Sequence, residues 1–215
     1  YLALKLADRN LDVVPYEADE NFSKMIEDIA NYKNALFLPP ESLKDVMREY
    51  QITAFKWMKT LIKYGFSGIL ADDMGLGKTV QLITYILYTI ETLQDEKPSL
   101  IICPTSVLGN WQKELQRFAP TLRVHTHYGA NRLKDDALLE LMTKQDAPQL
   151  VITTFGTVTQ DIEFLQTIDW NIVGLDEAQN IKNMHTQQSR SIRKLKGEHH
   201  VALTGTPVEN RLSEL

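Results

Sequence analysis

Cysteine is almost absent from this sequence. Cys103 is the single example in 215 residues, so no disulfide can form within the chain, and a reducing, intracellular compartment is the expected setting. Long apolar runs are missing too, because the longest uncharged apolar-rich stretch, residues 79–90, falls short of the ~20 residues that a membrane span needs. The first residues show neither a signal peptide nor an initiating methionine. We therefore expect a piece of a longer protein, with no membrane partner.

A large excess of charge of either sign is also missing. The 23 basic and 28 acidic residues give a net charge of −5, and 43% of the residues are apolar, which excludes a disordered chain, a collagen-like repeat and a small disulfide scaffold. This balance argues against a nucleic-acid binder that works by bulk charge alone. One local basic run, residues 182–196, has five basic residues and no acidic one. It is either a solvated helix face or a patch that faces phosphate.

Hydrophobic periodicity divides the chain into two regions. Residues 21–36 and 41–64 have helical spacing, and two prolines separate them. From residue 68 onward, short apolar runs alternate with amphipathic stretches, a pattern typical of an α/β fold with a mostly parallel sheet and helices on both faces. We expect a helical N-terminal extension, or the end of an upstream domain, at residues 1–38 and one α/β lobe at residues 39–215. The expected strands are 68–71, 100–103, 123–127, 150–154, 172–175 and 200–203, and the expected helices between them are 78–93, 107–118, 132–144, 156–166 and 178–195.

A glycine-rich loop follows the first expected strand, with the sequence DDMGLGKT at residues 72–79. Its glycines allow several backbone N–H groups to point at one phosphate, and the next helix adds its positive N-terminus. In such a loop Lys78 reaches the β- and γ-phosphates and the Thr79 hydroxyl ligates Mg²⁺. Asp72 stands where the general GxxxxGK[ST] pattern has glycine. The order of strand, loop and helix nevertheless favours a site for ATP with Mg²⁺ over a simple turn and helix cap.

An acidic pair, Asp176 and Glu177, follows the strand expected at residues 172–175. In open parallel sheets, ligands bind beyond the carboxyl ends of the strands, so we expect this pair beside the phosphate loop. Asp176 could hold Mg²⁺, directly or through water, and Glu177 could orient and deprotonate an attacking water. Without the loop upstream, two acids at this point would more often be a helix N-cap.

A third motif, LTGTP at residues 203–207, follows the last expected strand. Its hydroxyl residues, Thr204 and Thr206, could bond to the turn at residues 176–179. A turn without further function explains the motif equally well.

Together these motifs resemble the first motor lobe of helicase superfamily two, specifically the Swi/Snf-like family of double-stranded-DNA translocases and its bacterial members. The resemblance covers about residues 40–215, and the motifs occur in the order of the family. The family normally has an aspartate at the position of Asp72. The matching strings are REYQ at 48–51, ADDMGLGKT at 71–79, ICPTSVLGNW at 102–111, TTF at 153–155, LDEAQNIKN at 175–183 and ALTGTPVEN at 202–210.

The resemblance implies a RecA-like P-loop NTPase lobe and a role for each residue that matches a nucleotide motif. Gln51 corresponds to a glutamine whose amide pairs with the adenine ring. Lys78 and Glu177 are the implied catalytic residues, and Thr79 and Asp176 are the implied ligands of Mg²⁺. Asp73 replaces a commoner glutamate. The implied phosphate loop consists of Asp73, Met74, Gly75, Leu76 and Gly77.

The resemblance also implies nucleic-acid contacts and a coupling element. Two loops correspond to segments that touch the backbone of one DNA strand, and two residues just after the acidic motif are further candidates: Pro104, Thr105, Thr153, Thr154, Lys182 and Asn183. Gln179, Thr204 and Thr206 are expected to couple hydrolysis to DNA, and Gln179 stands where many members have histidine. Trp111 has helical spacing with Leu115 and Phe118, so we expect it in the core instead of stacked on a base.

The expected activity is that of an ATPase, namely the ATP-binding lobe of a motor that moves along double-stranded DNA by its sugar–phosphate backbone. Two alternatives stay open: an RNA or single-strand helicase lobe, and a nucleotide-gated DNA-binding module without turnover. In the family, a second RecA-like lobe supplies an arginine to the transferring phosphoryl group. We expect that lobe to be absent from these residues and hydrolysis by residues 1–215 alone to be near background. A bacterial cytoplasm or nucleoid is favoured over a nucleus.

Overall fold

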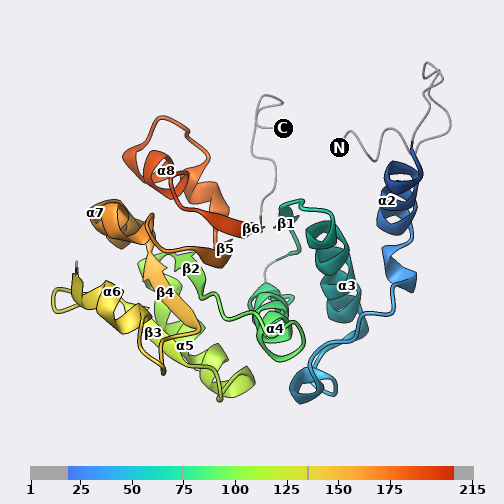
Figure 1. Cartoon of the computed structure of the whole chain (residues 1–215), viewed down its shortest axis with the longest axis horizontal. Helices are drawn as coiled ribbons and strands as arrows, with labels where there is room; N and C mark the ends of the chain where they lie inside the picture. Colours follow the sequence, from blue (N-terminus) through green and yellow to red (C-terminus); the bar gives the residue numbers. More distant parts are fainter. Residues whose placement is uncertain (1–18, 74, 135, 206–215) are drawn as a thin grey trace.

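The computed structural model describes residues 19–73, 75–134 and 136–205, and within them it contains one six-stranded sheet of order β1-β6-β5-β2-β4-β3 (Figure 1). All five strand pairings are parallel. The strand pattern expected from the sequence is therefore confirmed, with ends that differ by at most three residues. The strands are β1 (Gly68–Leu70), β2 (Ser99–Cys103), β3 (Val124–His127), β4 (Leu150–Thr154), β5 (Trp170–Leu175) and β6 (Gly197–Leu203).

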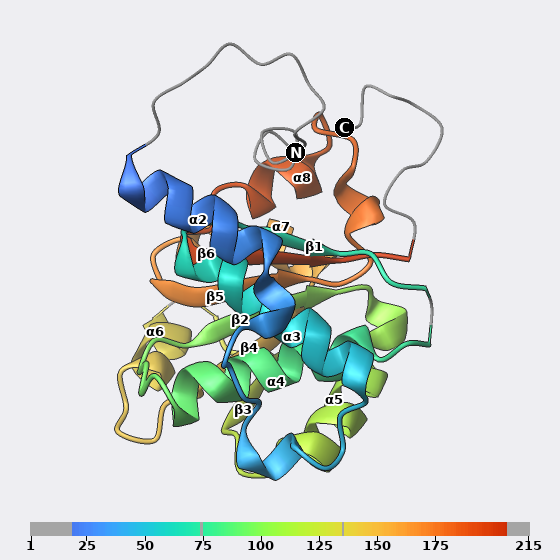
Figure 2. The same cartoon turned by 90° about the vertical axis from the view of Figure 1, so that its right-hand side faces the viewer.

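Helices cover both faces of this sheet, as the unbroken apolar runs in β2 and β4 require. Neighbouring residues of β2 divide between two buried clusters: Ile101 faces the helices of one side, and Leu100 faces those of the other. Figure 2 shows the helices of residues 49–118 on one side of β5 and β6 and those of residues 155–192 on the other. The first layer contains α3 (Glu49–Lys63), α4 (Lys78–Glu91) and α5 (Thr105–Phe118), and the second contains α6 (Asp136–Met142), α7 (Phe155–Leu165) and α8 (Gln187–Ile192).

The expectation of one helix at residues 178–195 is wrong. The structure has a short 3-10 turn, η3 (Ala178–Ile181), and then α8. Polar side chains divide the segment because they bond to nearby backbone groups: Asn183 Oδ1 accepts from His185 N–H at 3.0 Å, and the Thr186 hydroxyl caps α8 by accepting from Ser189 N–H at 3.2 Å. Such local bonds compete with helix formation. The segment that carries the acidic motif is therefore mostly a loop.

The helix expected at residues 41–64 also differs, because α3 begins only at Glu49 and a 3-10 turn, η2 (Glu41–Leu43), precedes it. The helix expected at 132–144 is limited to α6. None of the helices in the described ranges is long and apolar enough to span a membrane.

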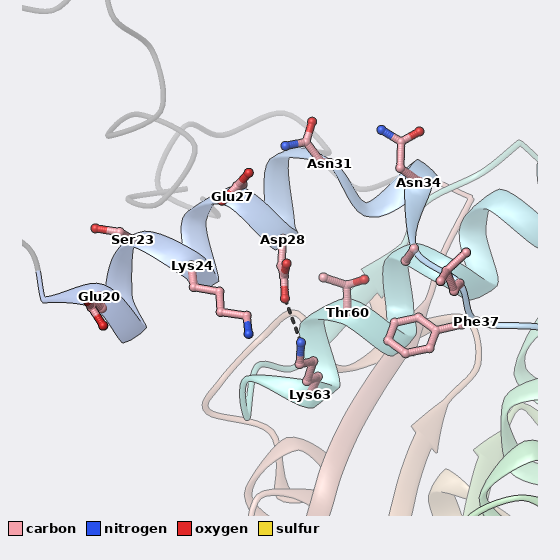
Figure 3. Close-up of a pocket in the computed structure, with 12 residues that line it drawn as sticks. Glu20, Ser23, Lys24, Glu27, Asp28, Asn31, Asn34, Phe37, Thr60 and Lys63 are labelled. Atoms are coloured by element: carbon pink, nitrogen blue, oxygen red, sulfur yellow. Dashed lines mark hydrogen bonds and ion pairs between the residues drawn. The ribbon is translucent and has the colours of Figure 1, made fainter.

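The described residues before residue 39 contain a helix, α2 (Glu20–Ala30), followed by the 3-10 turn η1 (Tyr32–Asn34). None of the α2 residues is buried. An ion pair joins α2 to α3, with 2.7 Å between Lys63 Nζ and Asp28 Oδ2 (Figure 3). Tyr64 Oη donates to the same carboxylate oxygen. Partly exposed ion pairs contribute about 0–1 kcal/mol, so α2 is held on the lobe by weak contacts and is not part of its core.

Candidate functional site

The phosphate-loop residues lie between the end of β1 and the start of α4, as the sequence predicts. Gly75 and Gly77 have positive φ angles of 84° and 76°, a conformation that glycine adopts without strain. Lys78 is the first residue of α4, and its Nζ donates to the backbone carbonyls of Asp72 at 2.7 Å and Asp73 at 3.0 Å. The ammonium group therefore lies against the loop that would surround a phosphate. Met74 lies outside the described residues.

Gln51 lies on α3 and packs against this loop. It is buried, its Nε2 donates to the Leu76 carbonyl at 3.2 Å, and its Oε1 accepts from the Arg48 N–H at 2.9 Å. A Cβ on Gly77 would come within 2.5 Å of Gln51 Nε2, so the loop needs glycine here for space as well as for its φ angle. The amide keeps one N–H and one lone pair, which are the groups that an adenine edge would need.

Asp176 follows β5 and lies close to the phosphate loop. Its Oδ2 accepts from Trp111 Nε1 at 2.7 Å, and its Oδ1 accepts from the Glu177 N–H at 2.9 Å. Burial raises the pKa of this carboxyl, while these two bonds and the Lys78 ammonium act in the opposite direction. Each oxygen retains a lone pair, and carboxylate oxygens are ligands that Mg²⁺ prefers. Lys78, Thr79 at the start of α4 and Asp176 therefore form a donor set that fits ATP with Mg²⁺.

Glu177 is the start of a hydrogen-bonded chain that crosses the carboxyl edge of the sheet. Its backbone is left-handed, with φ 49°, which is uncommon for a residue with a Cβ. Gln179 Nε2 donates to Glu177 Oε2 at 2.6 Å, and Thr204 Oγ1 donates to Gln179 Oε1 at 2.8 Å. Thr204 N–H in turn donates to the carbonyl of Leu70, the last residue of β1.

The bond expected between the third motif and the acidic turn is thus present, through Thr204 and Gln179. It joins Glu177 to the strand that precedes the phosphate loop. Thr206 lies outside the described residues.

The residues expected at the nucleic acid differ in exposure. Thr105 is exposed at the start of α5, where Pro104 is the N-cap residue, and Lys182 and Asn183 are exposed in the loop before α8. Thr153 and Thr154, by contrast, are 0% and 4% exposed.

The two buried threonines are used inside the fold. Thr153 Oγ1 donates to the carbonyl of His127 at 2.8 Å, and Thr154 Oγ1 caps α7 by accepting from Thr157 N–H at 3.3 Å. Both hydroxyls therefore already have hydrogen-bond partners inside the lobe, and their contact with a DNA backbone stays a prediction. No pattern in the sequence indicates this burial, because TTF ends a buried strand and starts a helix at the same point.

A buried ionic cluster at the end of β3 is also not indicated by the sequence. Arg132 makes two bonds to the Asp161 carboxylate, of 2.6 Å and 2.9 Å, and His127 Nε2 lies 2.8 Å from Asp161 Oδ2. Burial opposes ionisation of Asp161, but these bonds outweigh it and hold the pKa of the carboxyl below its usual value. Asp161 has a non-helical backbone within α7. Nothing in the sequence marks these three distant residues as neighbours.

A hydrogen bond from Trp111 is the second feature that the sequence does not indicate. The tryptophan is fully buried, so the expectation of core packing is confirmed, yet its indole N–H reaches the expected ligand of Mg²⁺. Apolar helical spacing predicts which face of a helix is buried. It does not predict which hydrogen-bond partner a polar group on that face, such as an indole N–H, will have.

Comparison with known proteins agrees with this geometry. The Bacillus subtilis (strain 168) protein YwqA, named as an ATP-dependent helicase/translocase, is 53% identical over 174 residues, which is 81% of this chain and 18% of YwqA. The chromatin-remodeling ATPase INO80 of Lodderomyces elongisporus is 38% identical over 82% of this chain and 12% of its own length. The chain thus spans less than a fifth of these two relatives.

Solved structures give the same result. The Sulfolobus solfataricus SWI2/SNF2 ATPase core in complex with dsDNA is 39% identical, with a TM-score of 0.67 over 78% of this chain and 34% of that one. The Sulfolobus solfataricus SWI2/SNF2 ATPase core domain is 37% identical, with a TM-score of 0.66 over 85% of this chain and 35% of that one. Residues 50–215 match the family described as SNF2-related domain. The chain belongs to the SNF2-related domain family.

Proposed function

We propose that this chain is the ATP-binding lobe of an ATP-dependent motor that moves along double-stranded DNA. The observation that carries the proposal is that the phosphate loop and the acidic turn meet at the carboxyl edge of the sheet. Lys78 lies on the loop, and hydrogen bonds through Gln179 and Thr204 connect Glu177 to the end of β1, from which the loop starts. The family supports ATP as the nucleotide. Mg²⁺ is part of the proposal: Thr79 and Asp176 would hold it, and it would neutralise negative charge on the phosphates.

The residues of this chain perform the remaining tasks. The loop N–H groups and Lys78 bind phosphate oxygens, and Thr79 and Asp176 hold Mg²⁺. Glu177 orients a water and accepts its proton. Gln179 and Thr204 connect Glu177 to the end of β1, and this chain of bonds holds the proposed general base in place next to the strand that leads into the phosphate loop.

The proposed DNA contacts lie in the loops at the carboxyl edge, with Thr105, Lys182 and Asn183 exposed there. The SWI2/SNF2 core from Sulfolobus, described in complex with dsDNA, supports a duplex as the partner. A second RecA-like lobe would close the nucleotide site from the other side. An intracellular location beside DNA belongs to the same proposal, and the bacterial relative supports a nucleoid.

The proposal predicts that ATP hydrolysis by the full-length protein rises when duplex DNA is added, while residues 1–215 alone stay near background. The reason is that an arginine supplied across the cleft contributes on the order of 10³–10⁵ in rate, and in this family it belongs to the second lobe. Steady-state ATPase assays with duplex DNA, single-stranded DNA and single-stranded RNA test this. Stimulation by RNA alone would favour an RNA helicase, and DNA binding without turnover would favour a nucleotide-gated module.

Replacing Lys182 with glutamate should weaken duplex binding to the same degree on unrelated sequences. Contacts to phosphate carry no base information, and losing one should reduce the slope of log affinity against log salt by about 1. Fluorescence anisotropy with two unrelated duplexes at several salt concentrations measures both quantities. Lys144→Glu is the matched control, because Lys144 lies beside residues that precede β2 and β4, at the opposite edge of the sheet. A loss confined to one sequence would contradict backbone tracking.

A further inference from the structure

Two tryptophans of this lobe are buried in the same way and differ in what their N–H groups meet. Trp111 is 0% exposed and Trp170 is 1% exposed. Trp170 Nε1 donates to the backbone carbonyl of Leu165 at 2.9 Å, an ordinary way to satisfy a buried indole. Trp111 Nε1 donates to Asp176 Oδ2 at 2.7 Å. Trp111 therefore uses its single N–H donor to bind the Asp176 carboxylate, which the proposed function assigns to Mg²⁺.

The bond restricts a group that is otherwise free to turn. The terminal torsion of an aspartate has broad, shallow preferences, so the plane of the Asp176 carboxylate is set by its partners. Within the described residues its Oδ1 accepts from the adjacent Glu177 N–H, which belongs to the same loop. Trp111 is the partner from another element, 65 residues earlier in the chain.

The Trp111 ring is itself held by the core. It lies in the apolar cluster between α3, α4, α5 and the sheet, and Leu108 and Leu115 lie one turn before and after it on α5. An indole N–H donates and cannot accept, so this contact favours the ionised carboxylate with its remaining lone pairs directed away from the core. Outer partners of this kind orient the groups that bind a metal, and losing one typically costs 10–100-fold in metal affinity or activity.

We propose that Trp111 is the positioning residue for Mg²⁺ binding by Asp176: its indole N–H fixes the carboxylate plane from the core side. This inference rests on the proposed function. Trp111 contacts neither nucleotide nor metal and acts only through Asp176.

The test compares Trp111→Phe with Trp170→Phe in the full-length protein. Each substitution replaces a buried indole by a smaller phenyl ring and removes the hydrogen bond that the indole N–H donates. Both variants should therefore have a lower melting temperature than the wild-type protein. Binding of a fluorescent ATP analogue is followed at increasing Mg²⁺, below the melting temperature of both variants and without turnover. Trp111→Phe should raise the half-saturating Mg²⁺ concentration at least 10-fold and leave metal-free nucleotide binding within about 2-fold of wild type. Trp170→Phe should leave both values unchanged, because Trp170 begins the strand that Asp176 follows and is about 20 Å away.

A second variant separates the hydrogen bond from the packing. Replacing Trp111 with 3-benzothienylalanine keeps the fused ring and puts sulfur in place of the N–H, so the core stays filled. It should raise the half-saturating Mg²⁺ concentration as Trp111→Phe does, with a smaller loss of melting temperature. Wild-type Mg²⁺ dependence in this variant would overturn the inference, also in the case that Trp111→Phe does not fold. Failure of the wild-type protein to bind the analogue at any Mg²⁺ concentration would instead refute the proposed function.

Discussion

Replacement of Lys78 by alanine should abolish nucleotide binding at concentrations that saturate the wild-type protein. The lysine is the single cation on the described part of the phosphate loop, and its Nζ is already directed at the loop carbonyls. Removing one partner of a close charge pair costs about 2–5 kcal/mol, which corresponds to a loss on the order of 30- to 4,000-fold in affinity. Titration with a fluorescent ATP analogue in the presence of Mg²⁺ measures the loss.

The matched control for this variant is Lys56→Ala. Lys56 Nζ also donates to a backbone carbonyl, that of Lys33, but it lies on α3 away from the loop. Its replacement removes the same charge and the same kind of bond, and nucleotide affinity should stay at the wild-type value. Equal affinities in the Lys78→Ala and wild-type proteins would refute the assignment of the nucleotide site.

Glu177→Gln should separate binding from turnover. The amide keeps the size of the side chain, and its oxygen can still accept the bond from Gln179, so ATP affinity should change little. The amide cannot accept a proton from water, and the loss of a general base costs about 10²–10⁴-fold in rate. Single-turnover hydrolysis by the full-length protein with duplex DNA tests this.

Glu163→Gln, at an exposed position of α7, is the control for the charge change. It should hydrolyse ATP at the wild-type rate. Turnover by Glu177→Gln at that same rate would show that another group removes the proton and would leave Glu177 with a role in the turn alone.

The sheet could be predicted from the sequence because its signal is local and repeated. Strands buried on both faces, such as β2 and β4, are short apolar runs, and all six strands lie within three residues of their expected ends. The phosphate loop and the acidic pair were found for a similar reason, since each is contiguous and placed at a strand end. The helix expected at 178–195 failed because amphipathic spacing does not register the polar side chains of Asn183 and Thr186, which satisfy the backbone locally.

Contacts between residues far apart in the chain could not be predicted from sequence patterns. Trp111 and Asp176 are 65 positions apart, and Arg132 and Asp161 are 29 apart, so no window of periodicity contains both partners. Exposure was equally hidden at Thr153, where a motif residue expected at the DNA is fully buried. Spacing indicates which element a residue belongs to, and only the packed structure shows which partner satisfies it.

The place of β1 in the sheet affects how the protein folds while the ribosome is still synthesising it. Among the described residues β1 pairs only with β6, and Leu70 is matched with Leu203, 133 residues later in the chain. The strand that carries the phosphate loop must therefore wait for nearly the whole lobe to be synthesised before its one neighbour exists. At about 5–20 residues per second, that interval is on the order of 7–27 seconds. A nascent chain interrupted before β6 would expose an unpaired strand edge and would have no assembled place for ATP.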